Sequence, residues 1–190
     1  MTAPSQSAAT RISAHLGTNP HIEVVPHGLL EPVRRGTRAD PWSGQRPLRI
    51  GTFGNLVEEK GLGILVEAVS QVHQQDPRCG AELHTHGRWL DDNYRQQLRE
   101  RGRAVGLRWS DHGPYDHASG APHPARSLDV AIFPSLCEET YGLVVEEALA
   151  RGVPVLVSDL GALGERMGSG GLVTPAGDAA ALAAAIQRFL

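Results

Sequence analysis

Short apolar runs alternate with helical patterns along most of this 190-residue chain, and this alternation restricts the fold more than any other feature. Strand-like runs are expected at 48–53, 82–85, 107–112, 130–133 and 153–157, and helices at 61–75, 91–105, 143–150 and 179–190. Strands that alternate with helices predict β-α-β units, and therefore a Rossmann-like three-layer α/β/α fold with a mostly parallel sheet. Binding sites in such sheets lie beyond the carboxyl ends of the strands.

The residues before this alternation differ from it in pattern. A helix capped by Ser5 and a short strand at 22–25 are expected within residues 1–30. Residues 31–47 are rich in proline, glycine and arginine, which predicts a linker or a long loop. Residues 48–190 are then expected to form one domain.

Composition excludes several classes of protein. Hydrophobic residues make up 41% and charged residues 21% of the chain, as in a globular domain, and a net charge of −3 gives no basic field for a nucleic acid. Two cysteines suggest no disulfide framework. No apolar run approaches the roughly 18 residues of a membrane span, and the first residues lack a signal-peptide core. We therefore expect a cytoplasmic protein, located at the inner membrane face only through other parts of a longer chain, because this stretch shows no membrane contact.

The loop after the first strong strand carries glycine and the only lysine of the sequence. The strand leads into Gly54 and Asn55, and Lys60 stands just before a helix. Glycine lets backbone N–H groups approach a phosphate, and a helix start with a lysine adds positive charge. The loop is neither G-x-G-x-x-G nor a Walker A loop, which argues against a dinucleotide dehydrogenase and an ATPase. On spacing alone, an ordinary turn with a solvated lysine remains the alternative.

Two glutamates eight residues apart, Glu139 and Glu147, frame the start of the helix expected at 143–150. The backbone N–H groups of Gly142, Leu143 and Val144 lie between them. A carboxylate can accept two hydrogen bonds from a sugar diol, and amides at a helix start suit a diphosphate. The pattern therefore indicates a sugar-nucleotide site. Acidic residues also stabilise a first helical turn by themselves, so a structural role stays open.

Four stretches resemble, in order, the C-terminal domain of family 4 retaining glycosyltransferases, which have the two-domain GT-B fold. They are VVPHGL at 24–29, GTFGNLVEEKG at 51–61, PSLCEETYGLVVEEALARGVPVLVSD at 134–159 and LGALGERMGSGGLVTPAGDAAALAAAI at 160–186. The resemblance implies transfer of a sugar from a nucleotide-diphosphate sugar to an acceptor, of unknown identity, with retention of configuration. It implies no metal ion and no other cofactor. Residues 1–30 would be the end of an N-terminal domain that holds the acceptor, together with the strand between the two domains. This chain alone would bind donor without turnover.

The resemblance also implies roles for particular residues. Lys60 would bind the diphosphate and Glu139 the transferred sugar, as the two catalytic residues, and Glu147 would bind the ribose. The whole implied donor-binding set is Gly54, Asn55, Lys60, Glu139, Tyr141, Gly142, Leu143, Val144 and Glu147, with Arg88, Trp89 and Pro114 as weaker candidates for the walls around the base. Asn55 departs from the family, which often has arginine there. Tyr141 could stack on a ligand or pack over the helix start.

The sequence also offers alternatives to this interpretation. His84 and His86 face one side of a predicted strand, and His112, His117 and His123 lie in predicted loops, but no cysteine joins them and no H-E-x-x-H motif occurs, so no metal site is expected. A non-catalytic sugar-nucleotide-binding module would keep the same contacts as a transferase. A sugar-nucleotide epimerase of related fold would need acid–base residues of its own, for which the sequence shows no constellation.

Overall fold

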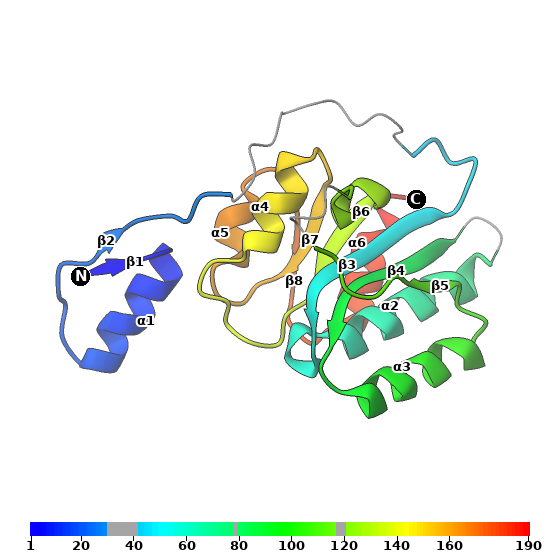
Figure 1. The fold of residues 1–190 in the computed structure, drawn as a ribbon, viewed down its shortest axis with the longest axis horizontal. Helices are drawn as coiled ribbons and strands as arrows, with labels where there is room; N and C mark the ends of the chain where they lie inside the picture. The colour runs from blue at the N-terminus through cyan, green and yellow to red at the C-terminus, as the bar shows by residue number, and fades with distance from the viewer. Residues whose placement is uncertain (30–41, 78–79, 117–120) are drawn as a thin grey trace.

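A computed structural model describes residues 1–29, 42–77, 80–116 and 121–190, and its main body is a fully parallel six-stranded sheet (Figure 1). The strand order is β5-β4-β3-β6-β7-β8. The strands are β3 (Leu48–Leu56), β4 (Ala81–Trp89), β5 (Trp109–Asp111), β6 (Val130–Phe133), β7 (Val155–Ser158) and β8 (Gly171–Thr174). The predicted Rossmann-like α/β fold is confirmed.

Helices cover both faces of the sheet (Figure 1). One layer holds α2 (Leu62–Gln75), α3 (Asp92–Ala104) and α6 (Ala179–Gln187), and the other holds α4 (Leu143–Ala150) and α5 (Leu163–Met167). Two short 3-10 helices, η1 (Glu58–Lys60) and η3 (Pro124–Ser127), lie in the connections. The predicted helices begin or end within three residues of these bounds.

Alternate side chains of each strand enter two separate hydrophobic cores, one on each face of the sheet. Leu156 of β7 packs into the core beneath α2 and α6, whereas its neighbours Val155 and Val157 pack into the core beneath α4. All three are at most 1% exposed. Successive strand residues point to opposite faces, so an uninterrupted apolar run is what a strand covered on both sides requires.

The first 29 residues form a small unit of their own beside the sheet (blue in Figure 1). Strands β1 (Thr2–Ala3) and β2 (Glu23–Val24) pair in parallel, and α1 (Gln6–Leu16) packs on them. The unit is joined to the sheet domain by hydrogen bonds: Ser5 Oγ donates to Thr140 O at 2.7 Å, and the carboxylate of Glu165 in α5 accepts from the backbone N of Gln6 and of Ser7. Most of the linker expected at 31–47, namely residues 31–41, lies outside the described residues.

Strand β3 is longer than predicted, because Gly54 and Asn55 continue the strand and do not form a loop. They pair with Gly87 and Arg88 of β4. Gly87 has a φ of 149°, and a Cβ atom there would lie 1.8 Å from the Gly54 carbonyl oxygen. Facing glycines thus let the two strands run together to the edge where the connections begin.

Strand β3 lies where the order of the sheet reverses. The chain goes from β3 to its neighbour β4 on one side, and later returns to β6 on the other side. The connections that leave β3 and β6 therefore turn away from each other and leave a crevice between them. A ligand site is expected at this edge of the sheet.

The turn from η1 into α2 packs against the chain just after β6. Gly61 has a φ of 72°, and a Cβ atom at this position would lie 1.9 Å from the carbonyl oxygen of Pro134. Only glycine adopts this backbone conformation readily and also permits the contact. The two connections that border the crevice are thereby held against each other.

We predict that Gly61→Ala lowers the free energy of unfolding by roughly 2–5 kcal/mol, because it adds left-handed strain of about 1–2 kcal/mol and a backbone clash of about 1–3 kcal/mol. Gly113→Ala is the matched control, since Gly113 has a φ of 71° with no atom within 4 Å of its added Cβ. It is expected to lose only the strain, about 1–2 kcal/mol. Urea unfolding measures both, and equal losses would contradict the close contact.

Candidate functional site

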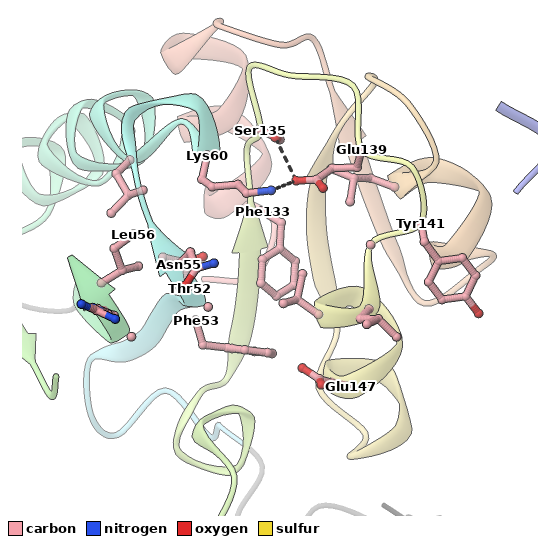
Figure 2. Close-up of a pocket in the computed structure, with 18 of the residues that line it drawn as sticks. Thr52, Phe53, Asn55, Leu56, Lys60, Phe133, Ser135, Glu139, Tyr141 and Glu147 are labelled. Atoms are coloured by element: carbon pink, nitrogen blue, oxygen red, sulfur yellow. Dashed lines mark hydrogen bonds and ion pairs between the residues drawn. The ribbon is translucent and has the colours of Figure 1, made fainter. Parts of the chain in front are cut away.

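A cavity of about 570 Å³ opens at the carboxyl ends of β3 and β6 (Figure 2). Its volume lies within the usual range of small-molecule sites. The end of β3, η1, the connection after β6 and the start of α4 all contribute to its wall. Of the residues that the sequence singled out, it is lined by Gly54, Asn55, Lys60, Arg88, Pro114, Glu139, Tyr141, Gly142, Leu143, Val144 and Glu147.

An ion pair crosses one end of this cavity. Lys60 Nζ, at the end of η1, pairs with Glu139 Oε1, and Ser135 Oγ donates a hydrogen bond to the same oxygen at 3.2 Å (Figure 2). The side chains of Lys60 and Glu139 are 38% and 21% exposed, so a ligand can reach both charges. The structure thus brings together two predicted residues that are 79 positions apart.

The loop before α5 contacts the backbone of Glu139 and restrains it. Ala162 N donates to Glu139 O at 2.9 Å. Gly161 has a φ of 64°, and a Cβ atom there would lie 2.5 Å from Glu139 N. This close approach limits how far the backbone of Glu139 can shift, and therefore where its side chain enters the cavity.

Helix α4 begins at the cavity with no side-chain cap. Its N-cap residue is Gly142, with a φ of 83°, and no side chain of the described residues caps the helix. The first backbone N–H groups of a helix have no partner within the helix, so those of Leu143 and Val144 are available to a ligand. The predicted arrangement, with Glu139 before the helix and Glu147 in its second turn, is present.

Glu147 is oriented by residues that the sequence analysis did not assign to it. His123 Nε2 lies 3.5 Å from Glu147 Oε2, and both side chains are largely buried. His123 Nδ1 accepts a hydrogen bond from Ala125 N at 3.2 Å, so Nε2 carries the proton of the neutral ring and faces the carboxylate. Burial and the Glu147 carboxylate raise the pKa of the Tyr115 phenol to about 12. Tyr115 therefore stays protonated near neutral pH.

Trp89 does not line the cavity, in contrast to its prediction as a wall around the base. It follows Arg88 directly on β4, so the two side chains point to opposite faces. Trp89 packs on the face of the sheet that α3 covers, and its Nε1 lies 3.2 Å from the carboxylate of Asp111 in β5. Burial alone would raise the pKa of Asp111, but hydrogen bonds from Trp89, Arg95 and Thr85 hold that pKa below its ordinary value.

The ring of Tyr141 is turned away from the cavity (Figure 2). Its hydroxyl lies 2.6 Å from His27 O and 2.7 Å from Glu146 Oε1, and Arg166 lies over the ring at 5.0 Å from its centre. Of the two roles that the sequence left open for Tyr141, the geometry supports packing over the helix start. Tyr141 borders the cavity because it directly precedes Gly142, and its ring does not face the cavity.

Several lining residues lay outside the predicted set. They are His27, Thr52, Phe53, Leu56, Leu62, Gly87, Tyr115, Phe133, Ser135, Thr140 and Leu163. Leu56 and Phe133 end strands, and Leu62 and Leu163 begin helices. The rule that ligands bind at the carboxyl ends of strands could have identified the strand-end residues.

Three of the histidines meet on the sheet beside a second cavity. The structure brings one ring nitrogen each of His84, His86 and His112 within 4.8 Å of one another. Burial lowers the pKa of His86 to about 4, and the neighbouring His112 and His84 contribute to the shift. His117 lies outside the described residues, and His123 lies at Glu147. The expectation that transfer requires no metal ion stays a prediction.

Comparisons with known proteins agree with this geometry. A family model described as glycosyl transferases group 1 matches residues 47–190. Phosphatidyl-myo-inositol mannosyltransferase of Mycobacterium leprae is 34% identical over 154 residues, which cover 79% of this chain and 38% of that protein. Glycogen synthase of Mycobacterium tuberculosis is 31% identical, over 83% of this chain and 39% of that protein. The chain thus spans well under half the length of these two relatives.

Solved structures share the fold. The crystal structure of Anabaena HepE in complex with UDP and glucose superposes with a TM-score of 0.80 at 22% identity, over 98% of this chain and 52% of that one. A glycosyltransferase from Rickettsia africae superposes with the same TM-score at 18% identity, over 99% of this chain and 52% of that chain.

Among the described residues, no helix is both long and apolar enough to cross a membrane.

The family match covers 47–190, the residues that form the six-stranded sheet and the cavity at its edge. The chain therefore belongs to the glycosyl transferases group 1 family, with the architecture of a GT-B C-terminal domain.

Proposed function

We propose that this chain is the donor-binding part of a retaining glycosyltransferase, and that its cavity binds a nucleotide-diphosphate sugar. The observation that carries the proposal is the arrangement of one cation, two carboxylates and a helix start around a single cavity. Lys60 and the amides of α4 would bind the diphosphate. Glu139 would accept hydrogen bonds from the sugar, and Glu147 from the ribose.

Charge supports this orientation of the donor. Lys60 is already balanced by Glu139, whereas Arg88 lines the cavity with no carboxylate partner among the described residues. Arg88 pairs in register with Asn55 on the next strand. A diphosphate near Asn55 would therefore meet two cations, Lys60 and Arg88. Pro114 also lines the cavity and would border the base.

The chemistry that this arrangement suits needs no protein nucleophile. The bond between the anomeric carbon and the diphosphate breaks, the acceptor oxygen attacks from the same face, and the leaving diphosphate takes the acceptor proton. The protein contributes by positioning the donor and by stabilising the negative charge that develops on the diphosphate. Lys60, Arg88 and the N-terminal end of α4 would supply that stabilisation, so no metal ion is needed for it.

The names of the similar proteins support the general class. The curated relatives include mannosyltransferases and a glycogen synthase, and one solved neighbour holds UDP and glucose. The chain covers about half or less of these proteins. We therefore propose that the acceptor is held by another domain of a longer protein, as in a two-domain enzyme. The alternative is a non-catalytic module that binds a sugar nucleotide, and transfer assayed with the longer protein separates the two.

The first prediction concerns nucleotide binding. Among UDP, GDP, ADP and their common sugars, one nucleotide is expected to stabilise the chain by about 2.7 kcal/mol at roughly 100 times its dissociation constant. Lys60→Ala and Glu147→Ala should each abolish this shift in melting temperature. The matched control is Glu138→Ala, because Glu138 precedes Glu139 but pairs with Arg11 and does not line the cavity. No shift with any nucleotide, or an equal shift in all variants, would sink the proposal.

The second prediction separates ligand binding from stability. Glu139→Ala should change the free energy of unfolding by less than about 1 kcal/mol, because its ion pair is partly exposed. Asp129→Ala should lose about 3–5 kcal/mol, since Asp129 is 3% exposed and binds Arg46 through both guanidinium nitrogens, at 2.5 and 3.0 Å. Urea unfolding compares them, and a comparable loss in both variants would mean that Glu139 serves the fold.

A further inference from the structure

A cluster of three histidines lies outside the proposed donor site. His84 and His86 come from β4, and His112 follows β5 directly. His84 and His86 are buried, whereas His112 is exposed, so the cluster is built into the sheet and open to solvent at one side. An adjoining cavity of about 330 Å³ is lined by His86, His112 and Ser127 among others.

The hydrogen bonds around the cluster fix which nitrogens carry lone pairs. His84 Nε2 lies 3.0 Å from the Glu82 carboxylate, which accepts its proton, so His84 Nδ1 holds the lone pair. That nitrogen lies 2.9 Å from His112 Nε2. His86 Nε2 lies 3.2 Å from Ser127 Oγ, whose own proton is donated to Pro124 O. His86 Nε2 therefore donates to Ser127 Oγ, and His86 Nδ1 holds the lone pair.

We propose that His84, His86 and His112 form a binding site for a divalent transition-metal ion of the Zn²⁺ type. The ion would take the place of the proton in the hydrogen bond between His84 Nδ1 and His112 Nε2. Two nitrogens on a tetrahedral zinc ion are about 3.3 Å apart, close to the distance already present. When His112 moves its proton from Nε2 to Nδ1, both lone pairs face the ion and all rings stay neutral.

The environment has the features that such sites use. The metal-binding histidine commonly donates its other ring proton to a carboxylate, as His84 does to Glu82. Imidazole nitrogen is a preferred ligand of zinc, copper and nickel. The rings of His86 and His112 are stacked within 4° of parallel, so the His86 ring would rotate about its Cβ–Cγ bond and give up its hydrogen bond to Ser127, while His112 stays beside His84. Water from the adjoining cavity takes the fourth position.

Metal binding would tie β4 to the segment after β5. That segment continues from His112 through Gly113 and Pro114 to Tyr115, and the last two residues line the donor cavity. The ion would thus stabilise one wall of the cavity without entering it. Binding of this ion would not depend on the proposed transferase function.

The test is titration of the tag-free, chelator-treated chain with Zn²⁺ by calorimetry, together with the melting temperature. One equivalent is expected to bind and to raise the melting temperature. His112→Ala, at an exposed position, should lose this binding, and Glu82→Gln should weaken it about 10- to 100-fold. His15→Ala, an exposed histidine of α1, is the matched control and should bind as the unmodified chain does.

Two results would overturn the proposal. The first is a folded chain that takes up no Zn²⁺, and the second is equal Zn²⁺ binding by the unmodified chain and by His112→Ala. Co²⁺ provides an independent readout, because tetrahedral coordination gives it strong visible absorption. That absorption is expected in the unmodified chain and absent in His112→Ala, and a folded His112→Ala chain that keeps it would also contradict the site.

Discussion

Strand β3 pairs with β4 on one side and with β6 on the other, and the position of every site residue depends on this pairing. The connection after β3 brings Lys60 to the edge of the sheet, and the connection after β6 brings Glu139 to meet it. Neither residue is near the other in sequence. Parallel pairing through the backbone, with helices covering both faces, is what converts their separation along the chain into a direct contact.

Close contacts between backbones make this edge of the sheet precise. Gly61 rests on Pro134, Gly87 faces Gly54, and Gly161 lies beneath Glu139, and at each of these positions a side chain would collide with backbone atoms. The carboxylates, the lysine and the helix start are therefore carried by connections that have little room to shift. The proposed binding of a flexible diphosphate would benefit from such rigidity, because less of the protein has to be ordered when the ligand binds.

The sequence predicted the fold, and it singled out the charged residues that the structure brings to one cavity, because both depend on local patterns. Lys60, Glu139 and Glu147 stand at positions where a strand ends or a helix starts, and the spacing of the two glutamates places them around one helix start. Trp89 was expected in a loop after a short strand, whereas β4 continues through Trp89, because the length of β4 is set by pairing with β3. His123 and Tyr115 were missed as neighbours of Glu147, since residues 113–123 carry no periodic pattern. Their position results from packing against Phe53.

The ion pair between Lys60 and Glu139 has a consequence for selectivity. The charge of Lys60 is already balanced by Glu139, so a small anion such as inorganic phosphate would compete with a carboxylate that also accepts a hydrogen bond from Ser135. Such an anion offers Glu139 nothing in return for the lost lysine. A ligand that carries a phosphate and, a few atoms away, hydroxyl donors can satisfy both partners at once. The pair would therefore favour ligands in which the two chemical groups are covalently joined.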